Sequence, residues 1–220
     1  KRMMLEDNPA ANIESPKQAK ALPKYLTLEE SIELLGAVKN DTASPNRVRD
    51  YAIITLFLNC GMRVSELVGI SLNDIDRELR SLRVVGKGNK ERLVPMGEMA
   101  QDALRAYLAE RPASYELQDS DLLFVNRYGK GLSRISAFKT VKATAILAGV
   151  TKMISPHTFR HSFATHLIEN GADLRLVQEM LGHESVTTTE IYTHIDRSYL
   201  REQVLNCFPR NRTKAEMQQD

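Results

Sequence analysis

The chain has 220 residues, of which 42% are hydrophobic and 26% charged, as in an ordinary globular protein with a sizeable core. Thirty Lys and Arg against 28 Asp and Glu leave a formal net charge of only +2, which by itself does not indicate a nucleic-acid partner. The composition excludes a largely disordered, collagen-like or disulfide-stapled chain. The longest apolar run, residues 52–58, is far shorter than the roughly 20 residues of a membrane helix, so we expect no membrane partner. Cys60 and Cys207 are unclustered and are typical of reduced thiols in a cytoplasmic protein.

The N-terminal residues 1–24 are predicted to be a linker, because they contain three prolines and little periodic hydrophobicity. Thr27 and Glu30 then have the spacing of a capping box, which predicts the start of a helix. The apolar stripe of that helix consists of Leu28, Ile32, Leu35 and Val38. A second helix, over residues 47–59, is apolar all round in its central part, so we expect it in the centre of the core.

A β-hairpin is predicted next along the chain. A short helix over residues 63–68 follows Gly61, and residues 81–85 and 91–95 then have the composition of strands. Between these strands lies the turn 86–90, which contains two glycines and two lysines. The hairpin should therefore carry a basic tip.

The rest of the chain is predicted to be helical. Apolar residues at helical spacing indicate helices around residues 100–108 and 135–145, the second closed by Gly149. Ser155 followed by Pro156 is the preferred start of a further helix, which Gly171 ends. Residues 173–181 form the next helix, stopped by Gly182, and residues 200–208 a last short one. The predicted fold class is mainly α with a small antiparallel hairpin sheet (α+β).

The near-zero net charge hides an uneven distribution. No Asp or Glu occurs between residues 122 and 168, whereas several Lys and Arg do. A localised basic surface of this kind is what binding to a phosphate backbone needs, although chance clustering on solvated helix faces is an equal alternative. The candidate DNA-binding residues in this stretch and in the hairpin are Lys90, Arg92, Arg127, Lys130, Arg134, Lys139 and Lys142.

His157 and Arg160 are a candidate pair for phosphate chemistry. They stand three residues apart near a helix start, so both should project from one face, where the helix adds partial positive charge. Arg can bind two phosphate oxygens as a fork and His can transfer a proton, while an ordinary surface ion-pair site is the alternative. With His161 and His166 the region is rich in histidine, but the spacing lacks the Glu of H-E-x-x-H. We therefore predict no metal site.

Three further residues could serve the same chemistry. Arg63 follows a wholly apolar helix, so its charge must meet an anion, either a buried acid such as Glu66 or a ligand. His183 stands just after a predicted helix end, and Tyr192 follows nine residues later. A helix-capping histidine and a half-buried core tyrosine are the alternatives for these two.

Taken in order, these residues resemble the tyrosine recombinase (phage integrase) family. The segments GMRVSEL, VGKGNKERLVP, SPHTFRHSFATHLIENGADLRLVQEMLGH and TTTEIYTH are most similar to its Xer-type site-specific recombinases, and the likeness extends from about Leu22 to Asn206. It implies the fold of that family's catalytic domain. It also implies a role for each candidate residue. Arg63 and Arg160 would bind the scissile phosphate, and Tyr192 would be the nucleophile. Lys87 would be the general acid, His157 would assist proton transfer and His183 would add a hydrogen bond.

The resemblance also implies an activity and partners. Tyr192 would cut a DNA strand by forming a covalent 3′-phosphotyrosine, so rejoining needs no cofactor, neither a metal nor ATP. The expected partners are double-stranded DNA with a specific recombination site, a tetramer of protomers on two sites, and a paralogous recombinase or DNA translocase. The biological role would be DNA recombination or integration, with resolution of chromosome dimers as one form.

The same resemblance suggests a domain organisation. Residues 1–24 would link to an N-terminal core-binding domain, 25–195 would form the catalytic domain, 196–209 a C-terminal helix and 210–220 a flexible tail. The C-terminal helix could fold back on its own core or dock on a neighbouring protomer. Three rival functions are a type IB topoisomerase, a DNA-binding module with an inactive site and a metal-dependent hydrolase.

Overall fold

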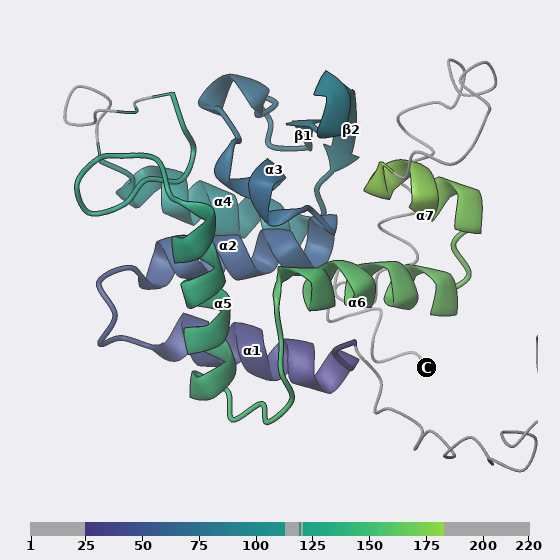
Figure 1. The fold of residues 1–220 in the computed structure, drawn as a ribbon. Coiled ribbons are helices and arrows are strands. Elements are labelled where there is room, and N and C mark those ends of the chain that lie inside the picture. The colour runs from purple at the N-terminus through teal and green to yellow at the C-terminus, as the bar shows by residue number, and fades with distance from the viewer. Residues whose placement is uncertain (1–24, 113–118, 120, 183–220) are drawn as a thin grey trace, which may run out of the picture.

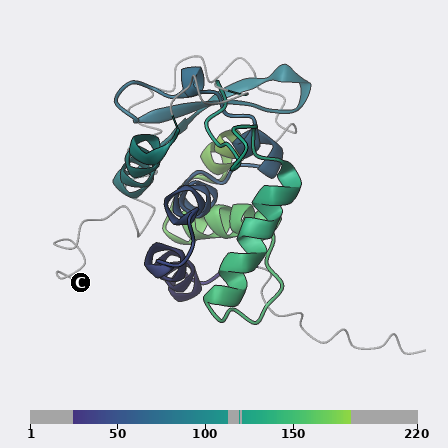
Figure 2. The same cartoon turned by 90° about the vertical axis from the view of Figure 1, so that its left-hand side faces the viewer.

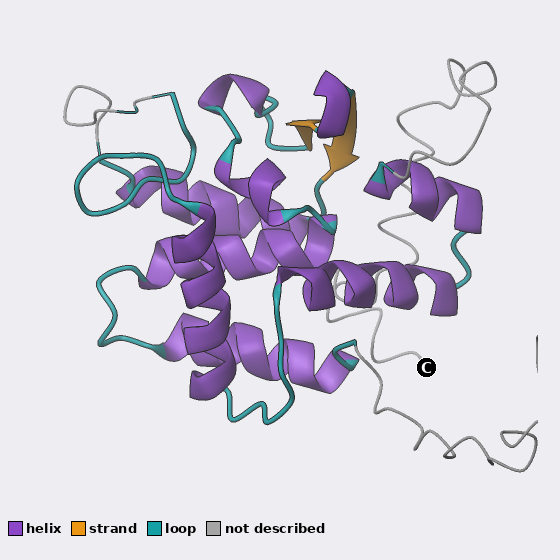
Figure 3. Cartoon of the chain, viewed as in Figure 1, coloured by secondary structure: helices purple, strands orange, loops and turns teal. Residues whose placement is uncertain are grey.

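Helices make up most of the computed structural model, which describes residues 25–112, 119 and 121–182. The helices are α1 (Leu28–Asn40), α2 (Arg47–Cys60), α3 (Val64–Val68), α4 (Glu98–Glu110), α5 (Arg134–Leu147), α6 (Pro156–Glu169) and α7 (Leu174–Leu181). The strands β1 (Ser81–Val85) and β2 (Glu91–Pro95) form one antiparallel hairpin, and 3-10 turns occur at η1 (Leu72–Asp74) and η2 (Lys87–Asn89). Figures 1 and 3 show this arrangement, which confirms the predicted fold class.

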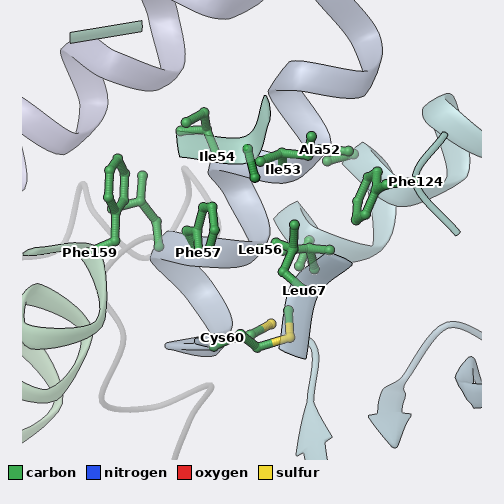
Figure 4. Packing of buried hydrophobic residues seen from close by; sticks show 14 of the residues in the cluster. Ala52, Ile53, Ile54, Leu56, Phe57, Cys60, Leu67, Phe124 and Phe159 are labelled. Atoms are coloured by element: carbon green, nitrogen blue, oxygen red, sulfur yellow. The ribbon is translucent and has the colours of Figure 1, made fainter. Parts of the chain in front are cut away.

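Helix α2 forms the centre of the core, as its apolar sequence predicts. Every residue from Ala52 to Cys60 is buried, and α2 packs against α1, α4 and α6. Its Phe57 ring lies 5.9 Å from the ring of Phe159 on α6, and Figure 4 shows both within the buried cluster. Burial of one such side chain stabilises the fold by about 1.5–3 kcal/mol, so α2 holds the surrounding helices together.

The hairpin lies at one end of the helices (Figure 2). Leu82 pairs with Val94, and Val84 pairs with Arg92. Because alternate residues of a strand point to opposite faces, these two pairs share one face, on which Leu82, Val84 and Val94 are buried. The turn between the strands holds Gly88 at a φ of +73°, a conformation that glycine adopts without strain.

Helices α6 and α7 pack together and contribute a second apolar cluster. Ser155 caps α6 by accepting a hydrogen bond from the N–H of Thr158, and Pro156 is the first helical residue, both as predicted. The cluster contains Phe163, Leu167, Leu176, Val177, Met180 and Leu181. Helix α7 also contacts β2, so it bridges α6 and the hairpin.

Several predicted boundaries differ slightly from the structure. Helix α2 extends one residue further, to Cys60. The short helix starts at Val64 rather than at residue 63, because Arg63 is the N-cap with extended backbone angles. Within the described part of the chain no helix is long and apolar enough to cross a membrane. The predicted linker 1–24 and the predicted helix 200–208 lie outside the described residues.

Candidate active site

Arg63 pairs with the buried acid that its sequence context suggested, Glu66. Gly61 ends α2 with a φ of +57°, and this turn directs the chain into α3 with Arg63 at its start. The guanidinium Nη1 of Arg63 donates to Oε1 of Glu66 at 2.8 Å, and its Nη2 donates to the carbonyl of Gly182 at 3.3 Å. One third of the side chain, 33%, is exposed. Arg63 is thus oriented by a buried acid and still open to a ligand.

Arg160 approaches the same place from α6. Its Nη1 donates to the carbonyl of Gly61 at 2.8 Å, and its Nη2 donates to the carbonyl of Leu181. Burial and the positive charge of Arg63 lower the pKa of Arg160 to about 10, with Glu66 opposing the shift and Arg92 adding to it. The side chain therefore keeps its charge at neutral pH.

Among residues 25–112, 119 and 121–182, Glu66 is the acid that pairs with these arginines. Its side chain is 2% exposed, and it accepts hydrogen bonds from Arg63 and from Arg92, whose Nη1 and Nη2 lie 2.9 and 2.8 Å from its two oxygens. Burial alone would raise the pKa of Glu66, but the hydrogen bonds from Arg92 and from the backbone of Arg63 outweigh it and lower the pKa to about 2. One negative charge thus faces three positive ones, and the excess favours an anionic ligand.

The three arginines also share the C-terminal end of α7. Arg92 Nε donates to the carbonyl of Met180 at 2.8 Å, Arg160 donates to that of Leu181, and Arg63 donates to that of Gly182. The last carbonyls of a helix lack partners within the helix and carry partial negative charge. We call Arg63, Arg92 and Arg160 the arginine cluster; it holds the end of α7 immediately before His183.

The remaining predicted catalytic residues are placed only in part. His157 lies in the first turn of α6 and is exposed, whereas Arg160, one turn later, points inward and is buried. The two side chains therefore differ in environment although they stand three residues apart. Lys87 begins the turn η2 between the strands. His183 and Tyr192 lie outside the described residues.

The candidate DNA-binding residues divide into two groups. Lys90 is exposed on the hairpin, Arg127 and Lys130 are exposed in the turn 126–130, and Arg134, Lys139 and Lys142 are exposed on α5. Two of these cations lie beside exposed aromatic rings: Arg127 is 4.7 Å from the Tyr128 ring centre and Lys142 is 5.2 Å from that of Phe138.

Arg92 forms the second group alone. Its side chain is only 13% exposed and is occupied by Glu66 and Met180. The alternation along β2 could have indicated this, because Arg92 and Val94 lie on the same face of the strand.

The sequence indicates Glu66 as a possible partner of Arg63, but it does not indicate that Glu66 also pairs with Arg92. That contact joins residues far apart in the sequence. Among residues 25–112, 119 and 121–182, no three His, Cys, Asp or Glu side chains are grouped so that they could hold a metal ion.

Comparison with known proteins shows the family to which this chain belongs. The model of the phage integrase family matches residues 24–198. The chain is 50% identical over 197 residues to a tyrosine recombinase XerD of Chlorobaculum tepidum, which covers 89% of this chain and 65% of that protein. It is 45% identical over 206 residues to a XerD of Halalkalibacterium halodurans, covering 93% and 68%. The chain thus spans about two thirds of the length of these curated relatives.

Solved structures show the same fold. A crystal structure of the XerA recombinase matches with a TM-score of 0.66 and 35% identity, covering 82% of this chain and 64% of that one. A XerH site-specific recombinase bound to its difH substrate in a pre-cleavage complex matches with a TM-score of 0.66 and 34% identity, covering 82% and 53%. From the family match and these likenesses, together with the arginine cluster, it follows that the chain belongs to the phage integrase family, the tyrosine recombinases.

Proposed function

We propose that this chain is the catalytic part of a Xer-type site-specific recombinase, which cuts and rejoins DNA strands through a covalent 3′-phosphotyrosine. The observation that carries the proposal is the meeting of Arg63 and Arg160 at the end of α7. These two guanidiniums lie together, and Glu66, the one carboxylate hydrogen-bonded to Arg63 among the described residues, is already shared with Arg92; such a site is suited to a phosphate. The likeness to XerH, whose structure contains a bound difH substrate, supports DNA as the source of that phosphate.

The proposed reaction assigns one step to each residue. The phenolic oxygen of Tyr192 attacks the phosphorus, an O–P bond forms, and the bond from phosphorus to the 5′-oxygen breaks. Lys87 gives a proton to the leaving 5′-oxygen, and His157 assists by accepting or donating a proton. Arg63 and Arg160 stabilise the charge on the non-bridging oxygens, and His183 adds a hydrogen bond. The ester keeps the bond energy, so a 5′-hydroxyl can reverse the reaction.

The proposed partners follow from the exposed cations and the relatives. Six cations would hold the phosphate backbone of double-stranded DNA: Lys90, Arg127, Lys130, Arg134, Lys139 and Lys142. All of them except Lys90 lie in the stretch from residue 122 to 168, which contains no acid, and this supports their role. In the cytoplasm, a tetramer of protomers would act on two specific sites, together with a paralogous recombinase or a DNA translocase.

The proposed domain organisation assigns residues 1–24 to a linker, 25–195 to the catalytic domain and 210–220 to a tail. Residues 196–209 would form a C-terminal helix that docks on a neighbouring protomer and couples the position of Tyr192 to assembly. The alternative is a helix that packs on its own core. The size of the protein–DNA complex with and without residues 196–220 distinguishes the two.

The proposed function is tested by trapping the covalent intermediate. The protein is incubated with a nicked half-site DNA in EDTA, and the covalent adduct is measured by denaturing electrophoresis. We expect the adduct to form in wild type, to form in the control Tyr128→Phe, whose ring is exposed, and to be absent in Tyr192→Phe, which should still bind DNA.

Three results would contradict the proposal. An adduct in Tyr192→Phe would show that another residue is the nucleophile. Dependence of cleavage on a removable metal would indicate a hydrolase instead. Relaxation of supercoiled DNA without strand exchange between two sites would favour a type IB topoisomerase.

A further inference from the structure

We propose that Arg92 is a positioning residue for strand cleavage and does not contact the DNA backbone. It joins the hairpin, the Glu66–Arg63 pair and the end of α7 into one arrangement. The inference rests on the proposed function, because it assigns Arg92 a role in that reaction, and it replaces the expectation that Arg92 binds DNA.

The contacts of Arg92 occupy all three of its nitrogens. Nη1 and Nη2 donate to the two oxygens of Glu66 at 2.9 and 2.8 Å, a bidentate pair, and Nε donates to the carbonyl of Met180 at 2.8 Å. Two parallel hydrogen bonds fix the plane of a guanidinium as well as its position. Arg92 is therefore held in one orientation by groups from two other elements.

Glycines bring two backbone segments close to this guanidinium. A Cβ added at Gly182 would lie 3.3 Å from Nη1 of Arg92, and one added at Gly86 would lie 3.7 Å from the same atom. Gly86 leads into the turn that carries Lys87, and Gly182 precedes His183. Arg92 thus lies between the two segments that lead to proposed catalytic residues.

Removal of Arg92 would also disturb Arg63. Glu66 is nearly inaccessible to water, so without Arg92 its carboxylate would keep hydrogen bonds from Arg63 and only the more distant charge of Arg160. Arg63 would then be drawn toward Glu66 and away from the carbonyl of Gly182. Small displacements of phosphate-binding groups slow catalysis strongly even when binding is retained.

The test compares Arg92→Lys with two controls. Lys keeps the charge but cannot donate to Met180 and to both oxygens of Glu66 in a fixed plane. Arg105→Lys makes the same change at an exposed pair with Asp102, and Lys139→Gln removes a proposed cation at the DNA backbone. For each variant we measure the DNA dissociation constant, its salt dependence and the rate of adduct formation at saturating DNA. We also measure hydrogen exchange of the amides of residues 176–182.

We expect Arg92→Lys to slow adduct formation at saturating DNA by about 10–100-fold, while its DNA affinity and salt dependence stay close to those of wild type. Amides at the end of α7 should exchange about tenfold faster. Lys139→Gln should show the opposite pattern, with weaker binding and a normal saturated rate, and Arg105→Lys should match wild type. Should Arg92→Lys fail to fold, Arg92→Gln, which keeps a donating amide group and removes the charge, is measured in the same way.

Two results would overturn the inference. One is weaker binding and a smaller salt dependence in Arg92→Lys with a normal saturated rate, which would place Arg92 on the DNA. The other is unchanged exchange at the end of α7. If the wild-type protein forms no adduct, the proposed function is contradicted, and so is the role of Arg92 in cleavage. Hydrogen exchange would still show whether Arg92 holds the end of α7.

Discussion

Glu66 shows how a single buried carboxylate can organise positively charged side chains that would otherwise repel one another. Its oxygens accept hydrogen bonds from Arg63 and Arg92. Burial raises the pKa of Glu66, but these hydrogen bonds outweigh burial and lower the pKa to about 2. An unfolded chain has none of these hydrogen bonds, so the carboxyl there titrates near the ordinary value of 4.5. The difference links the protonation of Glu66 to folding.

The stability contributed by Glu66 should therefore depend on pH. A lowered pKa in the folded state means that ionised Glu66 stabilises the protein above about pH 4.5, and that this contribution is lost as the pH falls toward about 2. Glu66→Gln cannot titrate, so its free energy of unfolding should approach that of wild type by roughly 1–3 kcal/mol over this window. Urea unfolding at a series of pH values measures the difference.

Glu33→Gln, at an exposed position of α1, is the control for the removal of any one carboxylate. Parallel stability curves for wild type and Glu66→Gln would show that the ion pairs do not lower the pKa of Glu66.

Helix α6, which carries His157 and Arg160, is hydrogen-bonded to the segment that precedes α1. The Oγ of Ser162 accepts a hydrogen bond from the N–H of Leu26 at 2.7 Å and donates to the carbonyl of Thr158 at 2.7 Å. Both Ser162 and Leu26 are fully buried. In addition, Lys152 donates to the carbonyl of Tyr25, the residue before Leu26, at 2.8 Å. The segment before α1 is thereby fastened to the helix of the candidate site.

Ser162→Ala should reduce the free energy of unfolding by about 1–3 kcal/mol, because it leaves the N–H of Leu26 buried without a partner. Ser31→Ala is a matched control, since Ser31 is equally buried but its Oγ only donates to the carbonyl of Thr27. That carbonyl keeps a hydrogen bond from the N–H of Ser31, so the reduction should stay below about 1 kcal/mol. Equal reductions in the two variants, measured by urea unfolding, would contradict this account.

Elements were predictable from the sequence where local chemistry decides them. The capping residues Thr27 and Ser155 and the stop at Gly182 mark helix ends, and the strand-like composition on both sides of the glycine-containing turn 86–90 predicts the hairpin. The arginine cluster was not predictable in the same way, because it depends on the tertiary approach of α3, β2, α6 and α7. The resemblance to a family indicates Arg63 and Arg160 as partners in one site, whereas the charge of Arg92 alone does not distinguish a DNA contact from a buried ion pair.

For the whole molecule, the distribution of charge is more informative than its sum. The net charge is +2, yet exposed cations gather on the hairpin, the turn 126–130 and α5, and the last two lie in a stretch without acids. A protein that uses such a surface should bind DNA through a limited number of phosphates, and neutralising each of them releases condensed counterions.

Lys139→Gln should weaken DNA binding and reduce the slope of log K against log salt by about 0.9 for each phosphate that is no longer neutralised. Lys39→Gln, which removes an exposed cation at the end of α1 next to Tyr51, should leave the slope unchanged. Fluorescence anisotropy titrations at several salt concentrations measure both. Identical slopes for wild type and Lys139→Gln would show that Lys139 on α5 does not neutralise a DNA phosphate.

The three carbonyls at the end of α7 have a consequence for the entropy of substrate binding. A free arginine side chain loses roughly 1.5–2 kcal/mol of rotamer freedom when it is fixed. Because the carbonyls of Leu181 and Gly182 already hold Arg160 and Arg63, most of this freedom is lost during folding, before the proposed phosphate is bound. The hydrogen bonds to a phosphate can then contribute more fully to affinity and to stabilisation of the transition state.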